Sequence, residues 1–277
     1  MACIFLRSIC FLIRAKLVVK MNDKLILFFV FIVAVVSLFY LFKDRAVAQG
    51  WRYASHEPTG IAPDPQKVRE AVIQIYSART WGWRGYFATH PWIAVKPTNA
   101  KFFTIYEKIG WRLRRGVKPV VIHQRPADAR WYGNVPELLV DLRGDGVDAI
   151  IAKVDKAAHS YPYSQDYSTY PGPNSNTFVA YIGREVPELK LDLPPTAIGK
   201  DYLGSSLIKR TISGTGFQFS MGGLLGVVAS WEVGLEFNIF GLVFGIDPLD
   251  PAIKLPMIGR IGPSLAGAPR QIDLKGK

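Results

Sequence analysis

One uninterrupted apolar run restricts what this chain can fold into more than any other feature of its sequence. The run, LILFFVFIVAVVSLFYLF from Leu25 to Phe42, has 18 residues with one serine and no charged side chain. As a helix it is roughly 27 Å long, close to the thickness of the hydrocarbon core of a bilayer. A helix in a globular core would keep a polar face, and this run has none. The run therefore predicts a transmembrane helix over residues 25–42.

The residues around the run leave two points open. Ala46–Gly50 is AVAQG, with the small residues of a signal-peptidase site, so a cleaved signal peptide is the alternative to a retained anchor. The run is longer than the apolar part of an ordinary signal peptide, which favours the anchor. An excess of Lys and Arg before the run predicts a single-pass protein of the inner (plasma) membrane, with residues 1–24 cytoplasmic and the body extracytoplasmic. Met21 is an alternative start, with Lys24 as the one Lys or Arg left on that side.

The charge balance and the cysteines narrow the class of partner and of site. The sequence has 34 Lys and Arg against 22 Asp and Glu, a net charge of +12, and the part after the run is itself basic. This excess favours anionic surroundings, so we expect membrane lipid or an anionic envelope polymer as partner. We expect no nucleic acid, because no binding module for it is recognisable. Cys3 and Cys10 both precede the run, and the four His have no metal-ligand spacing, so we expect no disulfide, metal or cofactor in the body. The oligomeric state stays open.

Changes of composition along the chain predict three parts after the anchor. Residues 43–67 are polar and rich in turn formers, which is typical of a tether. Residues 68–190 combine strand-like and helix-like stretches and predict an α+β core domain, in which 136–160 has the spacing of two helices broken at RGDG. Residues 191–277 begin with a proline-rich connector and continue with the Gly-punctuated alternation of a β-meander, which predicts a β-rich extension.

A predicted hairpin around Thr98–Ala100 carries the first candidate pair, His90 and Glu107, one on each strand. A four-residue loop places the two side chains opposite each other on one face. The carboxylate can then fix the tautomer of the imidazole, as the orienting group of a catalytic triad does. A five-residue loop turns Glu107 to the other face and leaves His90 opposite Lys108. The structural alternative is a polar His at a strand end and a solvated Glu.

The stretch YPGPNSNTFVAYIGREVPEL, Tyr170 to Leu189, carries the second candidate. Its polar trio precedes apolar residues at helical spacing, so we expect Asn174 to cap a helix that begins at Ser175. Backbone N–H groups point outward in the first turn of a helix and the potential there is positive, which suits a nucleophile and an oxyanion. The same place suits a capping hydroxyl, so a catalytic and a structural Ser175 both remain open. Asn174 and Asn176, on either side of it, are candidate binding residues.

Two further features are candidates for binding. Arg112, Arg114 and Arg115 lie in WRLRRGVK, which either holds anionic headgroups and envelope polymers or is a solvated loop. Trp92 is one of several Trp near His90 in the sequence. Such a residue belongs either to the core or to the wall of an apolar acyl or sugar pocket.

Long motifs over residues 68–262 carry a family resemblance. The stretches ARTWGWRGYFATHPWIAVKP, WYGNVPELLVDLRG and YPGPNSNTFVAYIGREVPEL resemble an uncharacterised bacterial family, domain of unknown function 3750. This resemblance implies a membrane-anchored envelope protein and supplies no activity. A fainter similarity, a His on an early strand and Asn-Ser-x-x-Phe-Val at a helix start, is to the circularly permuted papain-like hydrolases, including the lecithin:retinol acyltransferase group. It implies a permuted papain-like core with His90 as base and Ser175 in the place of the usual Cys.

The replacement of Cys by Ser separates two functional hypotheses. A Ser hydroxyl needs a well-aligned base, whereas a Cys thiolate forms readily, so the change means a re-tuned serine hydrolase or a loss of catalysis. The leading hypothesis is a noncatalytic or weakly catalytic envelope module that binds lipid or cell-wall material. The alternative is an amide or ester hydrolase with Ser175 as nucleophile, His90 as base and Glu107 as orienting residue.

Overall fold

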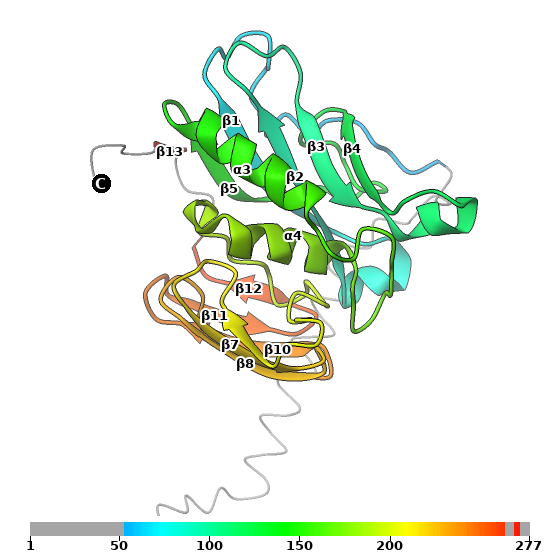
Figure 1. The fold of residues 1–277 in the computed structure, drawn as a ribbon, viewed down its shortest axis with the longest axis vertical. Helices are drawn as coiled ribbons and strands as arrows, with labels where there is room; N and C mark the ends of the chain where they lie inside the picture. The colour runs from blue at the N-terminus through cyan, green and yellow to red at the C-terminus, as the bar shows by residue number, and fades with distance from the viewer. Residues whose placement is uncertain (1–52, 264–268, 272–277) are drawn as a thin grey trace, which may run out of the picture. The chain divides into compact units, whose positions relative to one another are not determined.

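The structure, a computed structural model, describes residues 53–263 and 269–271. The chain divides into two units, Met1–Arg45 and Ala46–Lys277, and every described residue belongs to the second. Two β-sheets supply most of its elements, and two α-helices, α3 and α4, contact the first sheet (Figure 1).

The first sheet has six strands in the order β13-β5-β1-β2-β3-β4. Neighbouring strands are antiparallel, except that β13 is parallel to β5. The central strands are rich in Val, Ile and aromatic residues, which favour a pleated surface buried on both faces. The bounds are β1 Val72–Arg79, β2 Thr89–Lys96, β3 Thr104–Lys108, β4 Val120–Gln124, β5 Glu137–Arg143 and β13 Arg270–Gln271.

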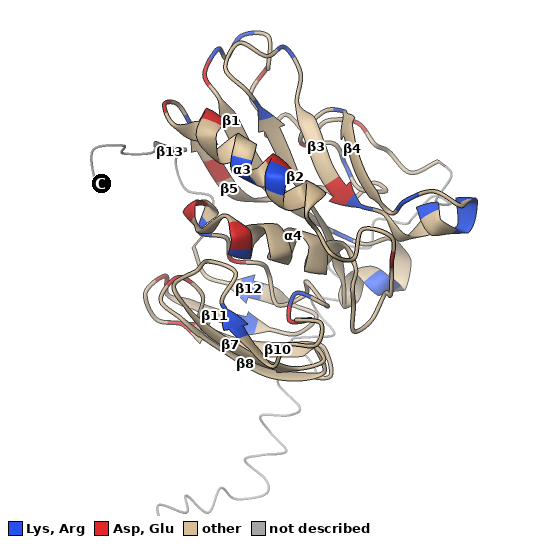
Figure 2. Cartoon of the chain, viewed as in Figure 1, with Lys and Arg blue, Asp and Glu red and all other residues tan. Residues whose placement is uncertain are grey.

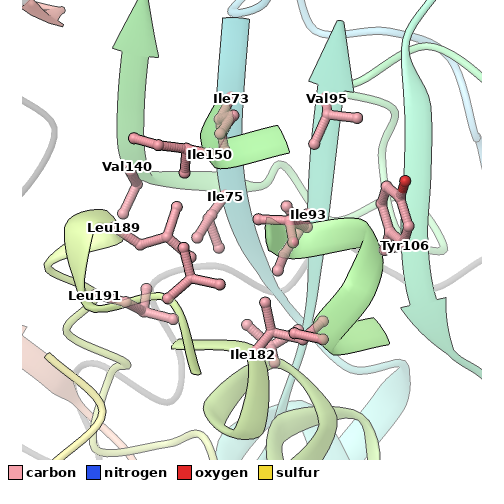
Figure 3. Close-up of a cluster of buried hydrophobic side chains, with 14 of the residues drawn as sticks. Ile73, Ile75, Ile93, Val95, Tyr106, Val140, Ile150, Ile182, Leu189 and Leu191 are labelled. Carbon is pink, nitrogen blue, oxygen red and sulfur yellow. The ribbon is translucent and has the colours of Figure 1, made fainter. Parts of the chain in front are cut away.

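Side chains of the central strands alternate between two apolar clusters, one on each face of the first sheet. On the face that we call the helix face, Ile75 and Ile93 pack with residues of α3 and α4 (Figure 3). On the other, which we call the aromatic face, Tyr76 and Trp92 pack with Phe103. Because successive side chains of a strand point to opposite faces, the position of a residue in β2 or β3 decides which cluster it joins.

The helices begin and end at recognisable signals. α3, Val147–His159, follows Gly146, whose φ of 83° is natural for glycine. α4, Ser175–Glu185, is capped by Asn174 and ends before Pro187, which cannot continue a helix. Three short 3-10 helices complete the connections, namely η1 Gly82–Tyr86, η2 Gly110–Arg115 and η3 Pro187–Leu189.

The second sheet is an antiparallel meander of seven strands in the order β12-β11-β10-β9-β8-β7-β6. It occupies the stretch in which Gly-punctuated alternation indicated a β-meander. The bounds are β6 Ile208–Arg210, β7 Gly216–Met221, β8 Leu225–Ser230, β9 Gly234–Ile239, β10 Leu242–Asp247, β11 Ala252–Leu255 and β12 Gly259–Ile261.

A buried network of charges joins the second sheet to the connector that precedes it. Lys254 on β11 donates to Asp192 of the connector at 2.7 Å and to Glu236 on β9 at 2.8 Å. Lys200, also in the connector, donates to Glu236 and to Asp201. All five side chains are almost completely buried. Each charge therefore has a partner of opposite sign, which is the condition for keeping ions out of water.

The expected fold class is wrong. We expected an α+β protein with an N-terminal transmembrane helix and a permuted papain-like core. The described residues instead form 13 strands in two sheets, with two α-helices. Part of the difference lies in Glu137–Arg143, which was expected to be helical and is strand β5, because it pairs with the distant strand β1 in the first sheet.

The expected location, a single pass through the inner membrane, is corrected by the same structure. Over residues 53–263 and 269–271, the helices are too short or too polar to cross a bilayer. The apolar run 25–42 and the segment 1–24 lie outside the described residues. Residues 43–52 of the expected tether also lie outside them.

Candidate functional site

Glu107 is the centre of a buried polar cluster on the aromatic face of the first sheet. Its carboxylate accepts hydrogen bonds from His90 Nε2 at 2.9 Å and from His123 Nε2 at 2.6 Å. Arg125 adds contacts of 3.3 and 3.4 Å to the two carboxylate oxygens. β2, β3, β4 and the turn after β4 thus each supply one member of the cluster.

The register of the hairpin differs from both expected registers, yet His90 and Glu107 still meet. Ile93 lies opposite Tyr106, so Glu107 follows one place along β3 and lies next to Trp92 rather than His90. This register is two residues from the one that would pair them. A shift of two preserves the face on which each side chain lies. The contact is therefore diagonal across the two strands.

The cluster holds Glu107 as a carboxylate and His90 as a neutral ring. Burial raises the pKa of Glu107, but the hydrogen bonds from His123 and His90 and the charge of Arg125 outweigh it, so that the pKa lies well below its ordinary value. Burial lowers the pKa of His90 despite the opposing effect of Glu107. A neutral His90 donates its Nε2 proton to the carboxylate, which fixes the tautomer.

Aromatic rings enclose the cluster. The His90 ring stacks on Trp131 at a centroid distance of 3.7 Å and an interplanar angle of 11°. The Arg125 guanidinium lies 4.7 Å from the centroid of the Trp92 ring. Trp92 itself is completely buried, and its Nε1 donates to Ala127 O at 2.7 Å, so this binding candidate is a core residue.

Sequence reasoning assigned neither His123 nor Arg125 to this cluster, and it did not place Trp131 against His90. His123 lies opposite Ile105 in the register of β3 and β4, one diagonal step from Glu107. The signal available was a short run of β-branched residues, VVI, after WRLRRGVKP, with a histidine directly after it. Trp131 comes from the loop after β4, whose path the sequence pattern does not define.

The start of α4 has the expected cap. The Asn174 side chain accepts hydrogen bonds from the backbone N–H groups of Asn176 at 2.9 Å and Thr177 at 3.1 Å. Thr177 Oγ1 accepts in return from the Asn174 N–H at 3.1 Å, which completes a capping box. Asn174 and Asn176 both donate from Nδ2 to Ile198 O, so these two binding candidates tie the helix to the connector.

Ser175 lies on the other side of the first sheet from the Glu107 cluster. α4 packs on the helix face, whereas His90 shares the side of β2 that carries Trp92 and stacks on Trp131. The start of α4 nevertheless lies close to the start of β2, because the Asn176 side chain donates from Nδ2 to Thr89 O at 3.1 Å. The polar neighbour of Ser175 is Tyr167, whose pKa burial raises while hydrogen bonds from Ser175 lower it. The structure thus brings His90 and Glu107 together and leaves Ser175 apart from both.

The basic candidates Arg112, Arg114 and Arg115 lie on η2, a short exposed helix between β3 and β4 (Figure 2). Arg112 Nε donates to Lys118 O at 2.8 Å, and the Arg115 guanidinium lies 4.7 Å from the centroid of the Trp111 ring. These contacts hold Arg112 and Arg115 against their own helix and loop. Their charge still faces solvent.

An open cavity of about 730 Å³ lies beside Arg125. We call it the Arg125 cavity. One wall is the proline-rich segment 58–65, which Asp128 holds by accepting the N–H groups of Thr59 and Ile61 at 3.1 and 2.7 Å. Phe102 and Phe103 form another wall. Within the described ranges, no group of His, Cys, Asp and Glu residues is arranged to hold a metal ion.

Residues 70–202 match the family model described as "Protein of unknown function (DUF3750)". The matched range includes the Glu107 cluster and α4 and ends before the second sheet. The match supports the resemblance to an uncharacterised family that the motifs indicated, and it supplies no activity. The chain matches none of the curated proteins and none of the solved structures with which it was compared.

Proposed function

We propose that the protein is a noncatalytic binding module that takes the acyl chain of a lipid in the Arg125 cavity. The volume of about 730 Å³ falls in the range of small-molecule sites, which are mostly apolar with a few polar groups that orient the ligand. Prolines and two phenylalanines supply the apolar walls. This lining favours an acyl chain over a cell-wall sugar, whose hydroxyl groups would need polar partners.

Arg125 is suited to hold the charged end of such a ligand. Its guanidinium has five N–H donors, and its contacts with Glu107 and with Pro126 O use each of the three nitrogens once. One N–H on each terminal nitrogen can therefore serve a carboxylate or a phosphate ester. The contacts with Glu107 and with the Trp92 ring hold the guanidinium in place, so little side-chain entropy is lost on binding.

The Glu107 cluster has a supporting role in this proposal. Its carboxylate is almost completely buried and has three partners, which suits a group that positions Arg125 rather than one that reacts. A hydrolase would need the Ser175 hydroxyl within reach of His90. The separation of the two side chains by the first sheet gives that alternative no support.

Titration of the full-length protein with cis-parinaric acid, a fluorescent fatty acid, tests the proposal. We expect saturable binding that the substitution Ala62→Phe weakens at least ~10-fold, because the larger ring fills the space for the ligand. Ala100→Phe, which adds the same ring at a residue that does not line the cavity, is the matched control. Equal affinity of the Ala62→Phe and Ala100→Phe variants, or no saturable binding by the wild type, contradicts the proposal.

A second comparison tests the role of Arg125. The substitution Arg125→Lys keeps the charge and removes the planar fork of donors. We expect it to weaken binding of a fatty acid more than binding of the matching fatty alcohol, which has no carboxylate. Equal losses of affinity for the fatty acid and the fatty alcohol would mean that Arg125 does not contact the carboxylate. The apolar walls would then be the sole basis of binding.

A further inference from the structure

The second sheet has an apolar face that none of the described residues covers. Side chains alternate along its strands, and the positions turned away from the connector carry Ile, Leu, Val, Phe and Met. Phe219, Val227, Phe237 and Phe244 form one continuous row across four neighbouring strands. Fourteen large apolar side chains on this face, which we call the outer face, have exposed fractions between 36% and 69%.

The polarity of this sheet is the reverse of the usual arrangement. An antiparallel sheet with one solvated face normally buries its apolar side chains and exposes its polar ones. Here the inner face is polar and buried, with Gln218, Glu236 and Lys254 in the charge network of the connector. Among the described residues, the apolar outer face is therefore not needed to attach the sheet to the first sheet or the connector. An exposed apolar face of this kind suits a partner.

The size of the outer face fits a protein interface. Strands β7 to β10 have six residues each, whereas β6, β11 and β12 have three or four. At about 3.4 Å per residue and about 4.8 Å between strands, the face covers about 550 Å² before the relief of the side chains is added. Two such faces in contact would bury on the order of 1,100 Å², close to the lower end of the range for stable complexes. An apolar patch of this size on a monomer is often functional.

The charges on and around the outer face favour a second copy of the chain over a charged partner. Its outward positions contain no acidic residue, and Arg210 at one corner is the single basic one among the described strands. A face this close to neutral meets an identical face without strong repulsion. An anionic bilayer would be matched by a basic rim, but Arg112, Arg114 and Arg115 lie on η2, between strands of the first sheet. On the strands of the second sheet, the acidic residues Glu236 and Asp247 and the basic Lys254 lie at buried inward positions.

We propose that the outer face packs on the outer face of a second copy of the chain, in a two-fold symmetric dimer. Two sheets in face-to-face contact about 10 Å apart form a β-sandwich, so the dimer would build across two chains a core that sandwich proteins build within one. The two-fold axis passes near Phe237, which lies on the middle strand and in the middle row of the face. The same residues are buried on both copies, as an isologous interface requires.

Sedimentation velocity of the full-length protein over a range of concentrations tests the dimer. We expect the paired substitutions Phe219→Glu and Phe244→Glu to raise the dissociation constant on the order of 100-fold, because four carboxylates would face one another in an apolar interface. Trp83→Glu with Val135→Glu, two exposed apolar residues outside the second sheet, is the matched control. Thermal unfolding of each variant shows whether the fold is kept.

Cross-linking locates the contact independently of these variants. In a chain with Cys3→Ser and Cys10→Ser, a short bis-maleimide should join two copies through Phe237→Cys and not through Val135→Cys. A monomeric wild type, or an unchanged dimer in the Phe219→Glu and Phe244→Glu variant, overturns the proposal. So does a monomer that binds phosphatidylcholine vesicles through this face and loses that binding in the same variant, because the occupant is then a lipid surface.

Discussion

His90 donates to Glu107 at 2.9 Å although the two residues do not face each other across β2 and β3. The diagonal contact leaves the second carboxylate oxygen to His123, so that one buried carboxylate joins three strands of the first sheet. Because Glu107 is almost completely buried, its partners stabilise the fold as well as the position of Arg125.

The first prediction concerns the substitution Glu107→Gln. Gln keeps the shape but loses the charge that His90, His123 and Arg125 share, and we expect a loss of about 2–3 kcal/mol in the free energy of unfolding at pH 7. The pKa of Glu107 is lowered on folding, so its contribution is present above the unfolded value of about 4.3 and is lost as the pH falls through the folded value. Urea unfolding at pH 7, 5 and 3.5 measures this. The difference in the free energy of unfolding between wild type and variant should shrink only below about pH 4.3. A difference that stays constant down to pH 3.5 would contradict a lowered pKa of Glu107 in the folded protein.

The second prediction concerns the charge network of the second sheet. Lys254→Met leaves Asp192 and Glu236 with one buried cation fewer, and we expect it to lower the free energy of unfolding by about 3–5 kcal/mol. Lys190→Met removes a surface lysine paired with Glu232, and we expect a change below about 1 kcal/mol. Chemical denaturation of both variants provides the comparison. If both variants lost similarly little free energy of unfolding, water would have to enter the network and solvate the acidic residues.

The sequence predicted local features better than long-range ones. The cap at Asn174 follows from its own side chain and the next three residues, and the structure has it. The contact of His90 with Glu107 was expected from a register that proved wrong, and it formed because an error of two residues preserves the face. Local chemistry and strand alternation therefore carried these predictions.

The failures come from contacts between distant parts of the chain. Glu137–Arg143 has apolar residues that fit both helical and strand spacing, and pairing with β1 decides for a strand. Alternation in the second sheet indicated strands, but its inner face depends on Asp192 and Lys200, which precede the sheet. A pattern within the strands gives no sign that the polar side chains face inward. Nor does it place Ser175 and His90 on opposite sides of the first sheet.

The third prediction concerns Lys108, which ends β3 on the helix face. Its ammonium donates to Tyr163 O at 3.0 Å and lies 4.8 Å from the centroid of the Tyr161 ring. Burial lowers the pKa of Lys108 to about 7, with Asp166 acting in the opposite direction. The unfolded chain keeps a value of about 10.4, so between these values the unfolded state binds more protons and the free energy of unfolding rises with pH.

The substitution Lys108→Met removes this dependence. Denaturant unfolding at pH 7, 8 and 9 should show the wild type gaining stability with pH relative to the variant, and Lys190→Met, at an exposed lysine, serves as the control. If the free energy of unfolding changed equally with pH in the wild type and in Lys108→Met, the ammonium would have an ordinary pKa in the folded protein.

The last prediction decides between a structural and a catalytic Ser175. The hydroxyl is almost completely buried at the start of α4, beside Tyr167, and the sheet separates it from His90, whose Nε2 already donates to Glu107. A serine without a base in hydrogen-bond reach is a weak nucleophile. We therefore expect a fluorophosphonate probe to label the wild type no more than Ser175→Ala, with a known serine hydrolase as positive control. Labelling that disappears in Ser175→Ala and persists in His90→Gln would instead mean that Ser175 is a nucleophile with a base other than His90. Labelling that disappears in both variants would support the triad predicted from the sequence.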